Sequence, residues 1–113
     1  MQTQQSNPPI AAIMRTLGDT TRRSLYETIV SRGETTVVDL TRGSGISQPA
    51  VSQHLRALRE AGLVRERRAG RNAFYRPEPA GLAPLVDWLD HYSVFWRDRL
   101  GALTALLKEI DPK

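Results

Sequence analysis

The amino-acid sequence predicts a mainly helical domain that carries one small β-hairpin wing. Three observations support this fold class. Apolar residues recur at spacings of three and four over most of the chain, which is the period of an amphipathic helix. Residues 63–79 lose that period and contain turn-forming residues, which is typical of a hairpin. A length of 113 residues with 40% hydrophobic residues fits a single domain with its own core.

Two helices open this domain, which we place at residues 8–110 behind a flexible polar tail of residues 1–7. The first helix follows a Pro-Pro pair and ends near residue 18. Asp19 is then expected to cap a second helix with the sequence TTRRSLYETIVSRG, which stops at Gly33.

A short helix and a longer one are expected next. In ETTVVDLTRGSG, Thr36 and Asp39 are spaced like a capping box, which favours a helix of two turns although the valines also suit a strand. In SGISQPAVSQHLRALREAGLV, Ser47 is a natural N-cap and Pro49 is tolerated in the first turn. A helical projection places the apolar residues of this stretch on one face and its polar residues on the other.

The remaining sequence predicts a hairpin and one long helix. LVRERRAGRNAFYRPEP suggests two strands with a basic tip at Gly70. From Gly81, apolar residues keep the helical period over about 28 residues, which is more apolar surface than one small core needs. We therefore expect part of this stripe, with Leu85, Trp88, Leu89, Tyr92, Trp96, Leu100 and Leu103, to meet a second subunit. A ligand pocket is the alternative reading of the aromatic residues.

This order of elements, α-α-α-α-β-β-α, is that of a winged helix-turn-helix, in which the fourth helix is the recognition helix and the hairpin is the wing. Residues 42–76 carry eight basic and two acidic side chains, a net +6, whereas the whole chain has +4. Positive charge concentrated in this way favours a nucleic-acid partner. A solvated basic face is the alternative.

Two stretches resemble a known family. LGDTTRRSLYETI looks like the helix opening L.DPTRR.IL..L, and ISQPAVSQHLRALREAGLVRERRAGRNAFYR is similar to the recognition helix and wing of the ArsR/SmtB class of bacterial repressors. The resemblance covers roughly residues 10–77. It implies a homodimer that is joined through the first and last helices, and so through Ile10, Ile13 and Met14 as well. Such a dimer binds operator DNA near its own gene and leaves the DNA when an inducer binds.

The best-known inducers of that family are metals, and we expect neither family metal site here. The family stretch ELCVCDL corresponds to ETTVVDL, in which Thr36 and Val38 replace the two cysteines and supply no soft ligand. On the last helix Asp87, Asp90 and His91 share a face, but no second histidine follows. No metal or cofactor is therefore expected, and the inducer stays unknown. The tryptophan-rich last helix resembles a metal-free branch of the family.

The candidate DNA-binding residues come from the recognition helix, the wing and the second helix. Glutamine suits adenine edges, and arginine suits guanine edges and phosphates. The candidates are Ser47, Gln48, Pro49, Ser52, Gln53, Arg56, Arg68, Arg71, Asn72 and Arg22. Ser47 is a helix cap in either case, and the two glutamines could be plain surface residues. His54 is expected to be a packed, hydrogen-bonded group and not a base reader.

The predicted function is that of a sequence-specific transcriptional regulator, a homodimeric repressor that binds a palindromic operator near its own gene. The alternatives are a winged-helix protein-interaction module and a non-specific nucleic-acid-binding protein. An enzyme is excluded, because no nucleophile, base and orienting group occur together and the chain has no cysteine. No apolar run is long enough to span a membrane and no leader is evident, so the cytoplasm is the expected compartment.

Overall fold

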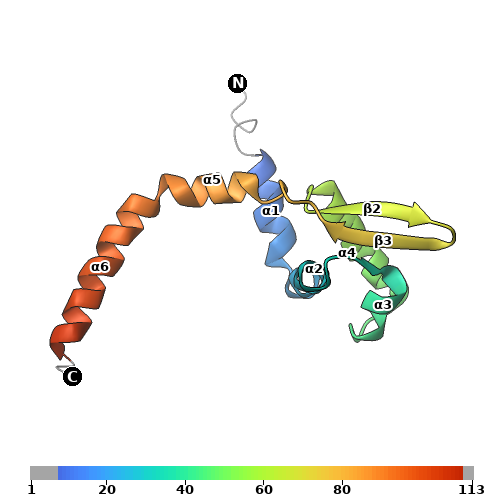
Figure 1. Cartoon of the computed structure of the whole chain (residues 1–113), viewed down its shortest axis with the longest axis horizontal. Helices are drawn as coiled ribbons and strands as arrows, with labels where there is room; N and C mark the ends of the chain where they lie inside the picture. Colours follow the sequence, from blue (N-terminus) through green and yellow to red (C-terminus); the bar gives the residue numbers. More distant parts are fainter. Residues whose placement is uncertain (1–7, 111–113) are drawn as a thin grey trace.

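The computed structural model describes residues 8–110, and the predicted tail of residues 1–7 lies outside them. Figure 1 shows a body of helices with a protruding hairpin and, on the other side, a helical arm. The elements are α1 (Pro8–Gly18), α2 (Thr20–Arg32), β1 (Thr35–Thr36), α3 (Val37–Arg42), α4 (Gln48–Glu60), β2 (Val64–Ala69), β3 (Asn72–Pro77), α5 (Ala83–His91) and α6 (Ser93–Ile110). The predicted fold class, a mainly helical winged helix-turn-helix, is confirmed.

Side-chain caps fix where α2 and α4 begin. The carboxylate of Asp19 accepts a hydrogen bond of 2.9 Å from the backbone N–H of Arg22. The hydroxyl of Ser47 accepts one of 3.3 Å from the backbone N–H of Ala50. Each cap satisfies a backbone donor that the first helical turn leaves unpaired. Both predicted caps are therefore confirmed.

Only half of the predicted capping box forms at α3. The hydroxyl of Thr36 accepts a hydrogen bond of 3.1 Å from the backbone N–H of Asp39. The carboxylate of Asp39 does not return to the cap and accepts instead from Nη1 of Arg42, at 3.0 Å. Aspartate is one methylene shorter than the Glu or Gln of a full box, and a cation one turn further on is within its reach.

The sheet has one strand more than the sequence predicts. The short strand β1 pairs antiparallel with β3, with Thr35 opposite Tyr75, so the strand order is β1-β3-β2. Thr35 and Thr36, the second of which is also the α3 cap, are β-branched and suit an extended backbone, and β3 offers them an unpaired edge. This pairing holds α3 beside the base of the wing.

The predicted single last helix is wrong, because it is divided at Tyr92 into α5 and α6. The backbone N–H of Tyr92 bonds to the carbonyl of Leu89 at 3.1 Å, an i→i−3 bond that tightens the last turn of α5. The run of His, Tyr, Ser, Val and Phe at this point has low helix propensity, which is the local reason for the break. As a result, α6 leaves at an angle to α5 (Figure 1).

The hydrophobic core lies where α1, α2, α4 and the base of the wing meet. Ile29, Val51, Leu55, Leu58 and Leu63 are all 0% exposed. Full burial of each such side chain contributes about 1.5–3 kcal/mol relative to leaving it in water. The three residues from α4 form the apolar face that the sequence predicts, so the core fixes which side of this helix faces outward.

Ile13 belongs to this core, which corrects its assignment to the dimer interface. Its side chain is 1% exposed within one chain and leaves no surface for a second subunit. Met14 is one residue, or about 100°, further around α1 and is exposed. Ile10 and Leu85 are half-buried. The stripe on α1 is thus divided between the core and the surface.

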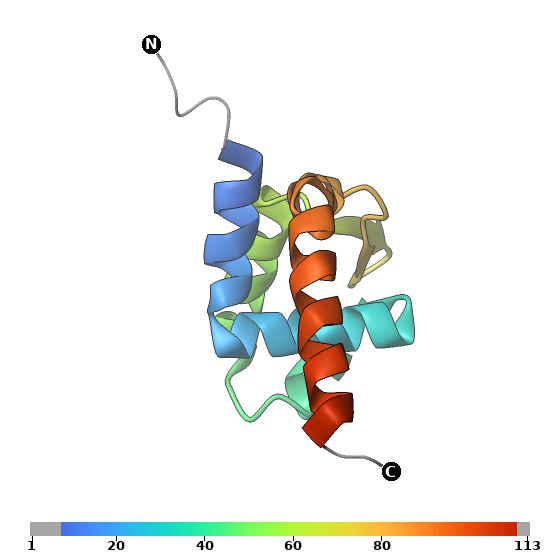
Figure 2. The ribbon, with the colours of Figure 1, turned by 90° about the vertical axis from the view of Figure 1, so that its left-hand side faces the viewer.

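The arm formed by α5 and α6 departs from the body. The helix α5 packs against α1, whereas α6 packs mainly against α5. Figure 1 shows α6 well away from the helices of the body, and Figure 2 views its full length from outside. Within the described residues, no helix is both long and apolar enough to cross a membrane.

Candidate nucleic-acid interface

A groove of about 500 Å³ separates the outer face of α4 from the wing. We call it the helix–wing groove. It is lined by Thr36, Val37, Val38, Gln48, Ser52, Gln53, Arg56, Arg59, Glu66, Arg68, Arg71, Asn72, Ala73 and Tyr75. Seven of the ten predicted DNA-binding residues are in this set. Residues from three separate segments of the sequence therefore line one hollow, and the seven candidates come from two of these segments, α4 and the wing.

The inner face of α4 is buried in the core, and this fixes which residues of the helix face outward. Val51, Leu55 and Leu58 are fully buried, and the 100° rotation per residue then leaves Ser52 and Gln53 exposed toward the groove. The Ser47 cap and the proline in the first turn fix where this face begins. These side chains can donate and accept hydrogen bonds without any change in the fold.

The other three predicted DNA-binding residues lie outside the groove. Ser47 and Pro49 are exposed at the start of α4. Arg22 is half-buried on α2, where its Nε donates a hydrogen bond of 3.2 Å to Nδ1 of His54. The expectation that His54 is a packed, hydrogen-bonded group is confirmed. Arg22 therefore supports the recognition helix from behind.

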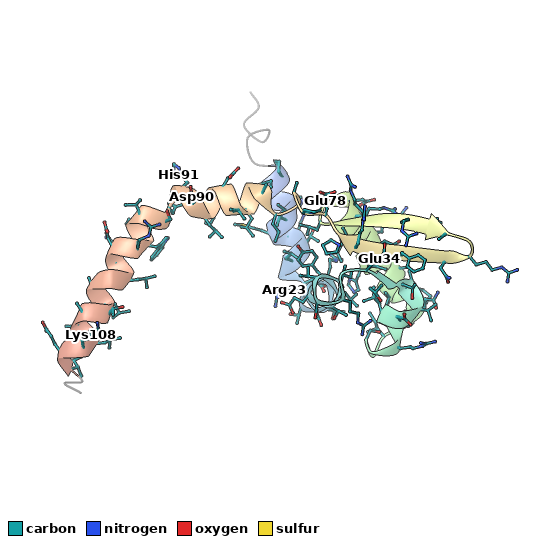
Figure 3. The ribbon with its side chains drawn as sticks, in the orientation of Figure 1. Arg23, Glu34, Glu78, Asp90, His91 and Lys108 are labelled. Carbon is teal, nitrogen blue, oxygen red and sulfur yellow. The ribbon has the colours of Figure 1, made fainter. Side chains whose placement is uncertain are left out.

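The neighbouring Arg23 also has a structural contact. Its Nη1 donates a hydrogen bond of 2.6 Å to the backbone carbonyl of Leu17, which ties the first turn of α2 to the end of α1. Figure 3 labels this residue at the junction of the two helices. The observed partner of this guanidinium is therefore a backbone carbonyl and not a carboxylate.

The two faces of the wing differ because side chains alternate along a strand. Arg67 lies on the face away from the groove, over the ring of Phe74 at 4.7 Å. Its guanidinium donates two hydrogen bonds to Glu34, of 3.1 and 3.3 Å, and holds the pKa of that carboxyl below its ordinary value. Arg65 pairs with Glu78. Figure 3 labels Glu34 and Glu78 beside the wing.

The tip of the wing is a two-residue turn of Gly70 and Arg71 between the paired residues Ala69 and Asn72. Gly70 has φ of +63°, the left-handed region that a glycine enters without steric cost and that the first turn residue needs here. Arg71 is exposed at the end of the hairpin, which projects beyond the body in Figure 1. A basic side chain on a projecting tip is suited to a phosphate or to the minor groove.

Sequence reasoning missed Arg59, Glu66 and Tyr75, which also line the groove. The carboxylate of Glu66 pairs with Arg59, and burial together with this carboxylate raises the pKa of the Tyr75 hydroxyl. The strand alternation of residues 64, 66 and 68 could have placed Glu66 on the same face as Arg68. The contact with Arg59 has no local signal, because it joins a helix to a strand.

The positions that match the family's metal ligands have other contacts here. Thr36 caps α3, and Val38 is an exposed apolar residue at the groove. Asp90 and His91 lie at the outer bend of the arm, far from the groove (Figure 3). No three His, Asp or Glu side chains gather into a metal-binding group within residues 8–110.

The arm carries a second, apolar surface. Trp88, Tyr92, Phe95 and Trp96 line a hollow of about 410 Å³ where α5 meets α6. Further along α6, Leu100, Leu103, Leu106, Leu107 and Ile110 are each at least half exposed. We call these nine residues the arm surface. A single subunit rarely leaves so many large apolar side chains together in water.

Comparisons with known proteins agree with this arrangement. The family model described as bacterial regulatory protein, arsR family, matches residues 28–66. An HTH-type transcriptional regulator of Mycobacterium tuberculosis is 41% identical over 91 residues, which are 80% of this chain and 81% of the relative. The biofilm growth-associated repressor of Xylella fastidiosa is 41% identical over 86 residues, which are 76% of this chain and 73% of the relative.

A solved structure is also similar. The crystal structure of a possible transcriptional regulator for arsenical resistance superimposes with a TM-score of 0.65 at 42% sequence identity, over 81% of this chain and 92% of the other. The matched share of the chain is large enough to include both the recognition helix and the wing.

Proposed function

Because this chain belongs to the ArsR family of bacterial regulatory proteins, we propose that it is a homodimeric repressor that binds a palindromic operator near its own gene. Its membership makes it a DNA-binding transcriptional repressor and not an enzyme. The dimer, the form of the operator and action in the cytoplasm are the proposed part.

The helix–wing groove is the observation that supports DNA reading. In helix-turn-helix proteins the recognition helix enters the major groove with its N-terminal residues against base edges. Gln48 and Gln53 occupy that half of α4 and can bond to adenine, while Arg56 is suited to guanine. Arg71 and Asn72 at the wing tip are suited to the adjacent backbone.

The arm surface supports the homodimer. Covering nine large apolar side chains by a second copy would remove them from water on both subunits at once. Two further interface candidates, Met14 on α1 and Leu89 on α5, are exposed as well. A two-fold dimer places two recognition helices about one DNA turn apart, which calls for a palindrome.

The test is fluorescence anisotropy of a labelled duplex from upstream of the gene for this chain, against a scrambled duplex, over a salt series. The expected result is tighter binding to the native duplex, with an affinity that falls by about 0.9 in log K per log salt unit for each phosphate that the protein neutralises. Gln53→Ala should lose roughly tenfold or more of the preference, since a bidentate base contact supplies about 1–3 kcal/mol.

The control is Ser31→Ala, an exposed residue at the end of α2 outside the groove, which should bind like the parent chain. Equal binding to both duplexes would favour the non-specific alternative. No binding to either duplex would favour a protein-interaction module.

A further inference from the structure

A carboxylate lies in the middle of the basic groove. Glu66 is the one acidic residue among those that line the helix–wing groove, and its side chain is 18% exposed. A negative charge on a surface that must approach phosphates weakens binding to every DNA sequence. The base contacts expected of the recognition helix do not explain why an acidic residue lies in this groove.

Glu66 binds two arginines from two elements. Its Oε1 pairs with Nη1 of Arg59 on α4. Its Oε2 lies 3.4 Å from Nε of Arg68 on β2. The same carboxylate thus joins the recognition helix to the wing, and it pairs with two of the four arginines that line the groove.

The environment of Glu66 makes its pair with Arg59, whose side chain is 43% exposed, stronger than an ordinary surface pair, whereas the Arg68 side chain is 72% exposed and its pair is weaker. Glu66 stands opposite Tyr75 in the β2–β3 register, and Tyr75 is buried beneath it. By contrast, the other pair beside the groove, Arg56 with Glu60, is 3.7 Å long, and both side chains are about 70% exposed. Screening by water makes such an exposed pair nearly neutral, whereas partial burial preserves the attraction.

We propose that Glu66 is a specificity-determining residue: it holds Arg59 and Arg68 in ion pairs and so keeps them from binding phosphates of arbitrary DNA. Binding then depends on the side chains that remain free to read bases, chiefly Gln48 and Gln53. The inference rests on the proposed function, and it assigns the discrimination against non-operator DNA to a residue that makes no base contact of its own.

The experiment compares Glu66→Gln with the parent chain on the scrambled duplex and on the native upstream duplex. Glutamine keeps the shape and removes the charge. Affinity for the scrambled duplex is expected to rise roughly tenfold, with a salt slope steeper by about 0.9 for each additional phosphate that the freed arginines neutralise. Affinity for the native duplex should rise less, so the ratio between the two duplexes falls.

Two further variants make the result specific. Glu60→Gln likewise removes one acid, in this case from α4, but its partner Arg56 is already solvated. Binding of this variant to the scrambled duplex should therefore stay within about twofold of the parent chain. Adding Arg59→Gln to Glu66→Gln removes the freed arginine that had the less exposed pair, and this should reverse much of the increase in affinity. Thermal unfolding of each variant checks that the fold is retained.

The inference is overturned if Glu66→Gln binds the scrambled duplex like Glu60→Gln, or if it loses affinity for both duplexes equally. A general loss would mean that Glu66 only supports the groove. These outcomes are separate from the failure of the proposed function, which is judged by whether the parent chain prefers the native duplex. The scrambled duplex tests Glu66 whether or not the operator has been identified correctly.

Discussion

Nε of Arg22 donates a hydrogen bond of 3.2 Å to Nδ1 of His54, which joins the start of α2 to the middle of the recognition helix. Nδ1 of the imidazole is the acceptor in this bond. The bond lies on the side of α4 away from the helix–wing groove, since neither residue lines that groove. The orientation of the recognition helix therefore depends partly on a contact behind it.

Replacing His54 by alanine should destabilise the domain. The substitution removes a half-buried hydrogen bond and leaves a donor of Arg22 without this partner, which costs about 1 kcal/mol in the free energy of unfolding. Urea denaturation measures the change, with His91→Ala as the control because the ring of His91 is exposed on the arm. Equal losses in the two variants would contradict a supporting role for His54.

Acid should destabilise the chain partly through Asp19. Hydrogen bonding from the backbone N–H of Arg22 holds the pKa of this carboxyl below its ordinary value of 3.8. A depressed folded-state pKa contributes stability that is present above the unfolded value and lost as the pH falls through the folded value. Unfolding measured between about pH 5 and pH 2 should therefore show this loss.

Asp19→Asn is the matched variant for that titration. Asparagine also caps helices well but carries no titrating charge. The free energy of unfolding of this variant should therefore fall less steeply on acidification than that of the parent chain. Identical slopes of stability against pH in the two chains would show that the depressed pKa of Asp19 contributes nothing measurable.

Local signals made much of this fold predictable. The Asp19 and Ser47 caps, the buried stripe of α4 and the turn at Gly70 each depend on residues within a few positions of one another. The residues that face the groove followed from the opposite, buried face of the same helix. This is why most of the candidate DNA-binding set was found together in the structure.

The features that were missed depend on contacts distant in the sequence. Strand β1 is only two residues long and exists because β3 offers an edge, which no short window of sequence reveals. The pair of Glu66 with Arg59 requires the packing of α4 against the wing. The apolar period continued through Tyr92 without interruption, so periodicity alone gave no sign of the break there. Periodicity also does not distinguish a residue of the core from one of a subunit interface, so it did not reveal that Ile13 is buried in the core.

Gly81 should not tolerate a side chain. A Cβ at this position would collide with the backbone carbonyl oxygen of Gly62 and lie 3.1 Å from the Cα of Leu63. Backbone atoms cannot move aside as a flexible side chain can, so Gly81→Ala should cost about 1–3 kcal/mol of folding free energy. Gly18→Ala, with nothing within 4 Å, is the control. Equal denaturation midpoints for both variants would contradict the close approach.

A charge on the arm surface should dissociate the proposed dimer. Leu103 lies at the centre of the helical stripe that contains Trp96, Leu100 and Leu107, and it is 50% exposed in the single chain. Lysine at this position would become an uncompensated charge in the interface, which costs about 3 kcal/mol or more. The dissociation constant measured by analytical ultracentrifugation should therefore rise roughly a hundredfold or more.

Ala105→Lys provides the comparison, because Ala105 is exposed on the opposite side of α6, two residues from Leu103. This variant adds the same charge to the same helix and should leave the dimer intact. The monomeric Leu103→Lys chain should also bind the native duplex more weakly, since one recognition helix then reads only half of the palindrome. If both lysine variants sediment like the parent chain, the arm surface is not the subunit interface.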